Sequence, residues 1–143
     1  MMSKEYVFED EHADHVVKRI LEAAKQIPGD AAGVIVVDRT CADWIDEHDG
    51  VDACFGVERL RFAGNACFDV REGGVFRPGY ATRISAVASY SRRWVDAGAE
   101  FEMLFLHNPY ARTPLAPELF ASDGFRHARR VEVKPGVFTL NLG

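Results

Sequence analysis

The stretch HNPYARTPLAPELF, residues 107–120, decides how the fold is read, because it follows the most strand-like run of the chain. Pro109 has no N–H to donate, so a strand that reaches it must end near His107 and Asn108. The later prolines predict a short helix over residues 114–121, with a proline near its first turn. That helix is expected to return three apolar side chains to the core, those of Leu115, Leu119 and Phe120.

The polar residues of this corner have two interpretations. His107 and Arg112 are expected to fasten the corner rather than to bind a substrate. The alternative is a small-ligand site formed by His107, Asn108, Tyr110 and Arg112.

Two strands are predicted before the corner, ISAVASYS (84–91) and EFEMLFLH (100–107). The short link between them contains Gly98 and favours an antiparallel hairpin. The alternation in EFEMLFLH indicates a half-exposed start and an end buried on both faces. Residues 129–134 and 137–142, joined around Pro135 and Gly136, predict a second hairpin that closes the fold.

Residues 10–27 predict an amphipathic helix, because their apolar residues recur with a 3.6-residue period. Pro28, Gly29 and Asp30 end it. The next run, GVIVVD (33–38), is apolar without alternation, which is typical of a central strand covered on both faces. A helix, a short turn and a buried strand indicate an α/β fold.

Residues 40–62 allow two interpretations. Thr40 could cap a helix that starts at CADWIDE, with HDG as a break before a second short helix. Alternatively, one helix runs into a strand. Residues 64–82 predict a loop or hairpin with a short strand at ACFDV. The whole chain, residues 1–143, is expected to form a single α/β domain (α+β remains open) with a mixed sheet of about five strands, an N-terminal helix and short middle helices.

Composition is that of an ordinary globular protein, with 48% hydrophobic and 27% charged residues. No apolar run approaches the roughly 20 residues that span a bilayer. The N-terminus is acidic and lacks the apolar core of a signal peptide, so a soluble, cytoplasmic protein is expected. Cys41, Cys54 and Cys67 form no close pair of the CxxC kind and are expected to be free thiols.

Charge is distributed unevenly around the net value of −5. Residues 1–60 hold 14 acidic and 6 basic residues, a net charge of −8, and residues 61–143 hold 8 acidic and 11 basic residues, a net charge of +3. This asymmetry favours a protein partner or self-association over a dedicated nucleic-acid binder.

Two acidic or histidine-rich motifs are expected to be solvated surface. His12 and His15 stand at i and i+3 on the first helix, a spacing that can hold a metal, but no third ligand is evident. The run DWIDEHDGVD (43–52) lacks the D-x-D-x-D-G pattern of a calcium loop. No metal site is therefore predicted from either motif.

Asp123, Glu132 and Lys134 have the order of a PD-(D/E)XK nuclease motif, in which carboxylates bind a divalent ion and the lysine activates water. Residues i and i+2 of a strand share a face, so Glu132 and Lys134 would point together. Only nine residues follow Lys134, too few to complete such a fold. An exposed hairpin face is the expected reading, and Mg²⁺ is a cofactor only under the nuclease alternative.

Basic residues gather at the start of the closing hairpin: Arg126, His127, Arg129, Arg130 and Lys134. Arg126, Arg129 and Arg130 could bind phosphates of a nucleic acid. No glycine-rich phosphate loop accompanies them, and a solvated or partner-facing edge is the expected reading.

Three segments taken in order resemble a known group: LEAAKQIPGDAAGVIVVD (21–38), TRISAVASYSRRW (82–94) and EFEMLFLHNPYARTPLAPELF (100–120). They are similar to the C-terminal part of uncharacterised bacterial proteins of the restriction-endonuclease-like, PD-(D/E)XK type. The resemblance covers about residues 18–120 and consists of structural rather than catalytic motifs. It implies that the metal-binding half lies upstream of the first helix, where only about ten residues stand here, so the catalytic strands are expected to be missing.

The function expected from the sequence is therefore a non-catalytic binding or assembly module that acts with a protein partner or as a homo-oligomer. No cofactor, metal or membrane association is expected. The alternative is a metal-dependent nuclease or nucleic-acid-binding protein that uses Asp123, Glu132 and Lys134.

Overall fold

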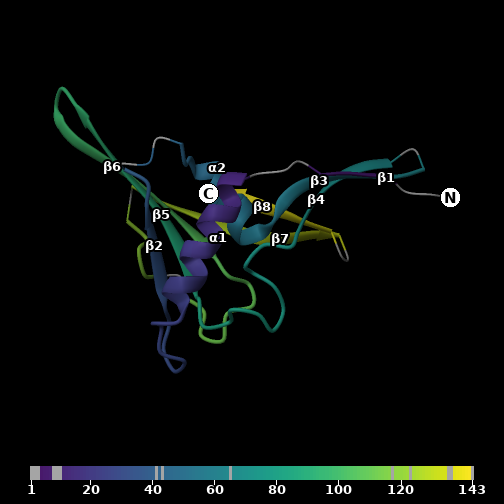
Figure 1. Cartoon of the computed structure of the whole chain (residues 1–143), viewed down its shortest axis with the longest axis horizontal. Helices are drawn as coiled ribbons and strands as arrows, with labels where there is room; N and C mark the ends of the chain where they lie inside the picture. Colours follow the sequence, from purple (N-terminus) through teal and green to yellow (C-terminus); the bar gives the residue numbers. More distant parts are fainter. Residues whose placement is uncertain are drawn as a thin grey trace.

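The computed structural model describes residues 4–7, 11–40, 42, 44–64, 66–116, 118–122, 124–134 and 137–142. Five strands form a mixed sheet in the order β2-β5-β6-β7-β8. Their bounds are β2 (Val34–Asp38), β5 (Ala86–Val95), β6 (Gly98–His107), β7 (Phe125–Lys134) and β8 (Val137–Leu142). This sheet and two helices, α1 (Glu11–Ala24) and α2 (Glu47–Phe55), confirm the predicted α/β fold (Figure 1).

A second, three-stranded sheet extends to one side of this body (Figure 1). Its order is β1-β3-β4, with β1 (Lys4–Val7), β3 (Val57–Ala63) and β4 (Ala66–Glu72). The sequence predicted only a short strand within β4. The alternative of one helix running into a strand is the correct one for residues 40–62, since α2 leads directly into β3.

The main sheet mixes both strand directions. β2 pairs with β5 in parallel, and β6 pairs with β7 in parallel. The predicted hairpins β5–β6 and β7–β8 are both antiparallel, as expected. The strands of the first hairpin are longer than predicted, because Arg93 pairs with Glu100 and only residues 96–97 form the turn.

Paired residues on neighbouring strands share a face of the sheet. We call one side the helix face, where Ile35, Val87, Leu104 and Leu106 pack in one cluster with Val16 and Ile20 of α1. We call the other side the open face, where Ala86, Ala88 and Phe105 pack with Leu115 of the segment between β6 and β7. Only part of the open face is covered by that segment.

β2 is not the central strand that its sequence predicts. It lies at an edge of the sheet and pairs only with β5 in the described part of the chain. Ile35 is buried on the helix face, but Val36 on the open face is 55% exposed. The prediction was wrong because an apolar run indicates what a strand prefers to contact and not which neighbours are present.

α2 begins later than predicted. Asp46 is its N-cap, and its side chain and that of Asp49 form a reciprocal capping box. Thr40 caps no helix, since its Oγ1 accepts a hydrogen bond from the Arg92 N–H. The predicted break at HDG lies inside α2.

The acidic run at residues 43–52 is not the solvated face that was predicted. Asp49 and Asp52 are both buried. Asp49 is held by the capping box, and Asp52 pairs with Arg71 of β4. Asp43 lies outside the described residues.

The predicted helix over residues 114–121 is also wrong. The described residues 113–116 and 118–122 contain only bends and a turn, and Pro117 lies outside them. Leu115 is buried as expected, but Leu119 and Phe120 are exposed. This segment must cross the open face to join two parallel strands, and three prolines in the crossover interrupt helical hydrogen bonding.

Candidate functional site

The corner after β6 is fastened by Asn108. Its backbone N–H donates to Ser85 O (3.0 Å), and its side-chain amide donates to Ile84 O (2.8 Å). Asn108 Oδ1 accepts from Tyr110 N–H (3.0 Å). Asn108 is buried, and its side-chain bond to Ile84 O is buried with it, whereas the bond from Tyr110 N–H is partly buried; an unpaired group in such a place is costly.

Neighbouring groups extend this fastening. Ser85 Oγ donates to Thr113 O and accepts from Gly33 N–H (3.0 Å). Arg112 N–H donates to Thr82 O (2.8 Å), whereas its guanidinium reaches Gly29 O only at 3.4 Å. The polar groups of Asn108, Ser85 and Arg112 are thus directed at backbone atoms of the fold.

His107 and His127 form a directional pair on the open face. His127 Nε2 lies 2.8 Å from Phe120 O, which can only accept, so Nε2 carries the proton. In a neutral ring Nδ1 of His127 then accepts, and His107 Nε2–H donates to it over 2.8 Å. The pKa of His107 is lowered to about 4, first by its burial and then by the nearby charge of Arg129 and by the neighbouring His127.

The three candidate arginines of β7 do not form one patch. The side chains of Arg126 and Arg130 belong to the helix face, and that of Arg129 belongs to the open face. Arg126 donates to Glu47 Oε2 (3.0 Å), and Arg130 donates to the Tyr110 hydroxyl (2.6 Å). Phosphate binding by these residues stays a prediction, and the geometry divides them between two sides of the sheet.

The nuclease motif is only partly described. Asp123 lies outside the described residues. Glu132 and Lys134 both lie in β7, where the pairing with β8 shifts register between them. In the described part of the chain, no three His, Cys, Asp or Glu side chains are grouped so that they could hold a metal ion.

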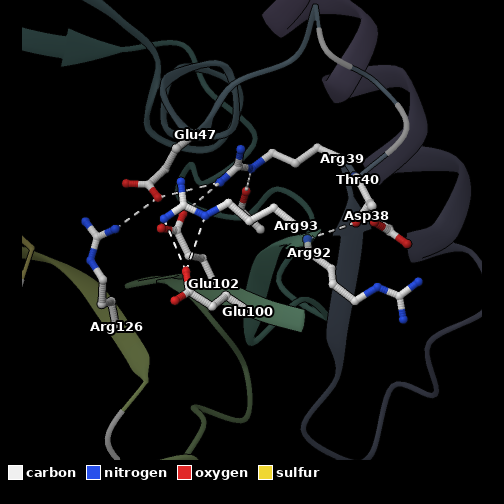
Figure 2. Close-up of polar contacts among 10 residues, drawn as sticks. Asp38, Arg39, Thr40, Glu47, Arg92, Arg93, Glu100, Glu102 and Arg126 are labelled. Atoms are coloured by element: carbon white, nitrogen blue, oxygen red, sulfur yellow. Dashed lines mark hydrogen bonds and ion pairs between the residues drawn. The ribbon is translucent and has the colours of Figure 1, made fainter. Parts of the chain in front are cut away.

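A charged network that the sequence did not reveal joins five elements of the helix face (Figure 2). Arg39, which follows β2, donates to Ser89 Oγ (3.1 Å) and lies 3.8 Å from Glu47 and 3.9 Å from Glu102. Glu47 also pairs with Arg126, as described above. The charge of Glu47 at the first turn of α2 is therefore offset by Arg39, which follows β2, and by Arg126 of β7.

One ion pair of this region had a signal in the sequence. Arg93 and Glu100 lie 3.3 Å apart across the β5–β6 hairpin. They stand symmetrically about the turn at residues 96–97, and opposite charges at such positions stabilise a hairpin. The predicted link at residues 92–99 hid that symmetry.

The open face carries four apolar side chains on neighbouring strands, which we call the apolar strip: the exposed Val36, Trp94 and Phe101 and the half-buried Tyr90. Trp94 is 76% exposed and Phe101 is 55% exposed. The Tyr90 and Phe101 rings lie 6.5 Å apart. Trp94 and Phe101 belong to residues 91–102, which we call the arm. The arm is the end of the β5–β6 hairpin, which projects from the body in Figure 1.

Arg92 lies on the same face as the strip. Its guanidinium is 5.7 Å from the centre of the Trp94 ring. Figure 2 shows it directed away from the charged network. Among the described residues no carboxylate lies within ion-pair distance of it, although its charge adds to the two Thr40 hydrogen bonds that lower the pKa of Asp38.

No family model, curated protein or solved structure matches this chain. The resemblance to restriction-endonuclease-like proteins therefore stays a prediction. Within the described residues, neither helix has the length and apolar composition needed to cross a membrane.

Proposed function

We propose that this chain is a non-catalytic association module that joins a second copy of itself through the apolar strip and the adjoining edge of the sheet. The observation that supports this most is the strip, because Val36, Trp94 and Phe101 keep most of their surface in water. Apolar side chains grouped in this way are typical of interaction surfaces.

The size of the strip suits a modest dimer interface. With roughly 200 Å² for an aromatic side chain, the exposed parts of Trp94 and Phe101 come to about 260 Å². A standard interface buries about 800 Å² on each partner. Two rings thus supply about a third of that area, before the β2 edge and the rest of the strip are counted.

The charges beside the strip suit a symmetric partner. Arg92 and Asp38 both lie on the open face, on neighbouring strands. A two-fold contact brings the same patch of both copies together, so a base of one copy can meet an acid of the other. The arginines of the helix face are already paired within one copy.

Sedimentation velocity of the full chain over a wide concentration range tests this function. We expect a monomer–dimer equilibrium. Val36→Lys places a charge in the strip and is expected to shift the chain to monomer, with the fold retained because Val36 is exposed. The matched control is Val131→Lys, an exposed valine of β7 that lies away from the strip.

A wild-type chain that stays monomeric at the highest concentration rejects self-association. Equal loss of dimer in both lysine variants also counts against the strip as the contact surface.

A further inference from the structure

The free edge of β2 has a defined set of outward backbone groups. Arg39 N–H donates to Tyr90 O (2.9 Å), and Gly33 O accepts from Ser85 N–H (2.8 Å). Residues 33 and 39 therefore direct their backbone groups toward β5. Successive residues of a strand alternate direction, so Val34, Val36 and Asp38 direct their N–H and C=O groups away from the sheet.

We propose that β2 pairs with β2 of the second copy in antiparallel fashion, about a two-fold axis at Val36, to join the two five-stranded sheets into one. This inference rests on the proposed self-association and specifies its geometry. Val36 then forms a hydrogen-bonded pair with Val36 of the second copy. Val34 of each copy pairs with Asp38 of the other. All three outward-facing residues find partners in this one register.

The composition of β2 favours this occupant. Its sequence, VIVVD, is apolar except for Asp38, yet among the described residues one edge of the strand has no neighbouring strand. Natural edge strands are often protected by charged side chains, proline or a bulge; β2 has a charge only at its last residue, Asp38, and contains no lysine, proline or bulge. A second copy of the same strand supplies the missing neighbour with matching apolar side chains.

The symmetric register brings no like charges of β2 close together. Asp38 of one copy lies four residues along from Asp38 of the other, about 14 Å in an extended strand, so their repulsion is weak. The chain before β2 in the second copy runs past the end of β2 toward the arm, and exposed Asp30 lies there. Continuing the register, residue 30 of the second copy is level with residue 42, two residues beyond the level of Arg92. Two strand spacings and this offset of about 7 Å give a backbone separation of about 12 Å, within the combined reach of the two side chains.

A proline substitution at Val36 tests the pairing of β2 with β2 of the second copy. Val36→Pro removes an outward N–H but no hydrogen bond to β5, so the monomer is expected to fold, as circular dichroism can show. The dimer dissociation constant from sedimentation is expected to rise at least tenfold. Val36→Thr keeps the N–H and the branched side chain and is expected to change the constant less than threefold.

A charge exchange tests the contact with the arm and does not depend on the proline variant. Arg92→Glu and Asp30→Arg are each expected to weaken the dimer, and the double variant is expected to recover most of the loss. Arg93→Glu is the matched control, because Arg93 faces the helix side and pairs with Glu100, so Asp30→Arg is expected to give no recovery with it.

The outcomes separate the two proposals. A wild-type monomer overturns the proposed function and this inference together. A wild-type dimer that Val36→Pro leaves intact, or a charge exchange without recovery, overturns only the edge pairing.

Discussion

Asn108→Ala is expected to lower the stability of the protein strongly, because the corner at residues 107–112 depends on its side chain. The substitution removes the bond to Ile84 O and the bond from Tyr110 N–H, and it keeps the backbone bond to Ser85 O. Each buried group left without a partner costs about 1–3 kcal/mol, so we expect a loss of about 3 kcal/mol. With an unfolding entropy of about 2.1 cal/mol/K per residue, 143 residues convert this loss into a drop in Tm of about 10 °C.

Differential scanning calorimetry of the purified chain measures this drop. Arg112→Ala is the control, since its exposed guanidinium makes one long bond to Gly29 O, and a loss below about 0.5 kcal/mol is expected. If Asn108→Ala melts within about 2 °C of the wild type, or if Arg112→Ala is equally damaging, the corner is not held as described.

Three further outcomes follow from the structure. The folded state favours neutral His107 and lowers its pKa to about 4, so the unfolded chain binds more protons between about pH 6.5 and 4. The free energy of unfolding, measured by urea titration, should therefore fall as the pH drops through this range. His107→Gln should flatten that part of the curve of unfolding free energy against pH. Gly74→Ala should cost about 2 kcal/mol in the same assay, since a Cβ there lies 2.3 Å from Cys54 O, a backbone atom. Gly29→Ala meets only the flexible side-chain ends of Arg112 and Arg83 and should change stability by less than about 0.5 kcal/mol. Glu47→Gln should lower the free energy of unfolding by about 1 kcal/mol at low salt, because Glu47 pairs with Arg39 and Arg126. This loss should shrink in 1 M NaCl, where the screening length is roughly 3 Å. A loss that salt leaves unchanged would show that charge is not its origin.

Hydrophobic periodicity and turn residues predicted the parts of the fold that depend on local sequence. The apolar stripe of α1 and the alternation in β6 each predicted an element that the structure contains. The Pro-Gly pair at 135–136 lies outside the described residues, but the hairpin that it predicted is present as the antiparallel pairing of β7 with β8. Pro109 correctly marked the end of β6. These features are readable because one face of each element must meet the core, whatever its neighbours are.

Features that depend on distant partners were not predictable in the same way. The apolar run of β2 did not show that its outer edge has no strand partner in the described part of the chain. Asp52 of α2 was expected to be solvated, but it pairs with Arg71 of β4, 19 residues later in the chain. The charged network around Arg39 joins residues far apart in sequence, so no local spacing marks it.

The candidate site residues also differ in whether the sequence alone could predict their role. Sequence reasoning expected His107 and Arg112 to fasten the corner, whereas the short hydrogen bonds described there are those of Asn108, one of which reaches Ile84, 24 residues earlier in the chain. It missed Trp94 and Phe101 as a surface feature, since both were read as parts of a link and a strand end. Exposure is a property of the assembled sheet and not of either residue alone.

Amide hydrogen exchange at Val34, Val36 and Asp38, measured at low and high protein concentration, tests the central claim most directly. Self-association through β2 predicts fast exchange of these three amides in the dilute monomer and protection at high concentration. The amides of Ile35 and Val37 point toward β5 and should be protected under both conditions. A dimer in which all three outward amides still exchange as fast as in the monomer contradicts the edge pairing, and a chain that shows no dimer contradicts self-association itself.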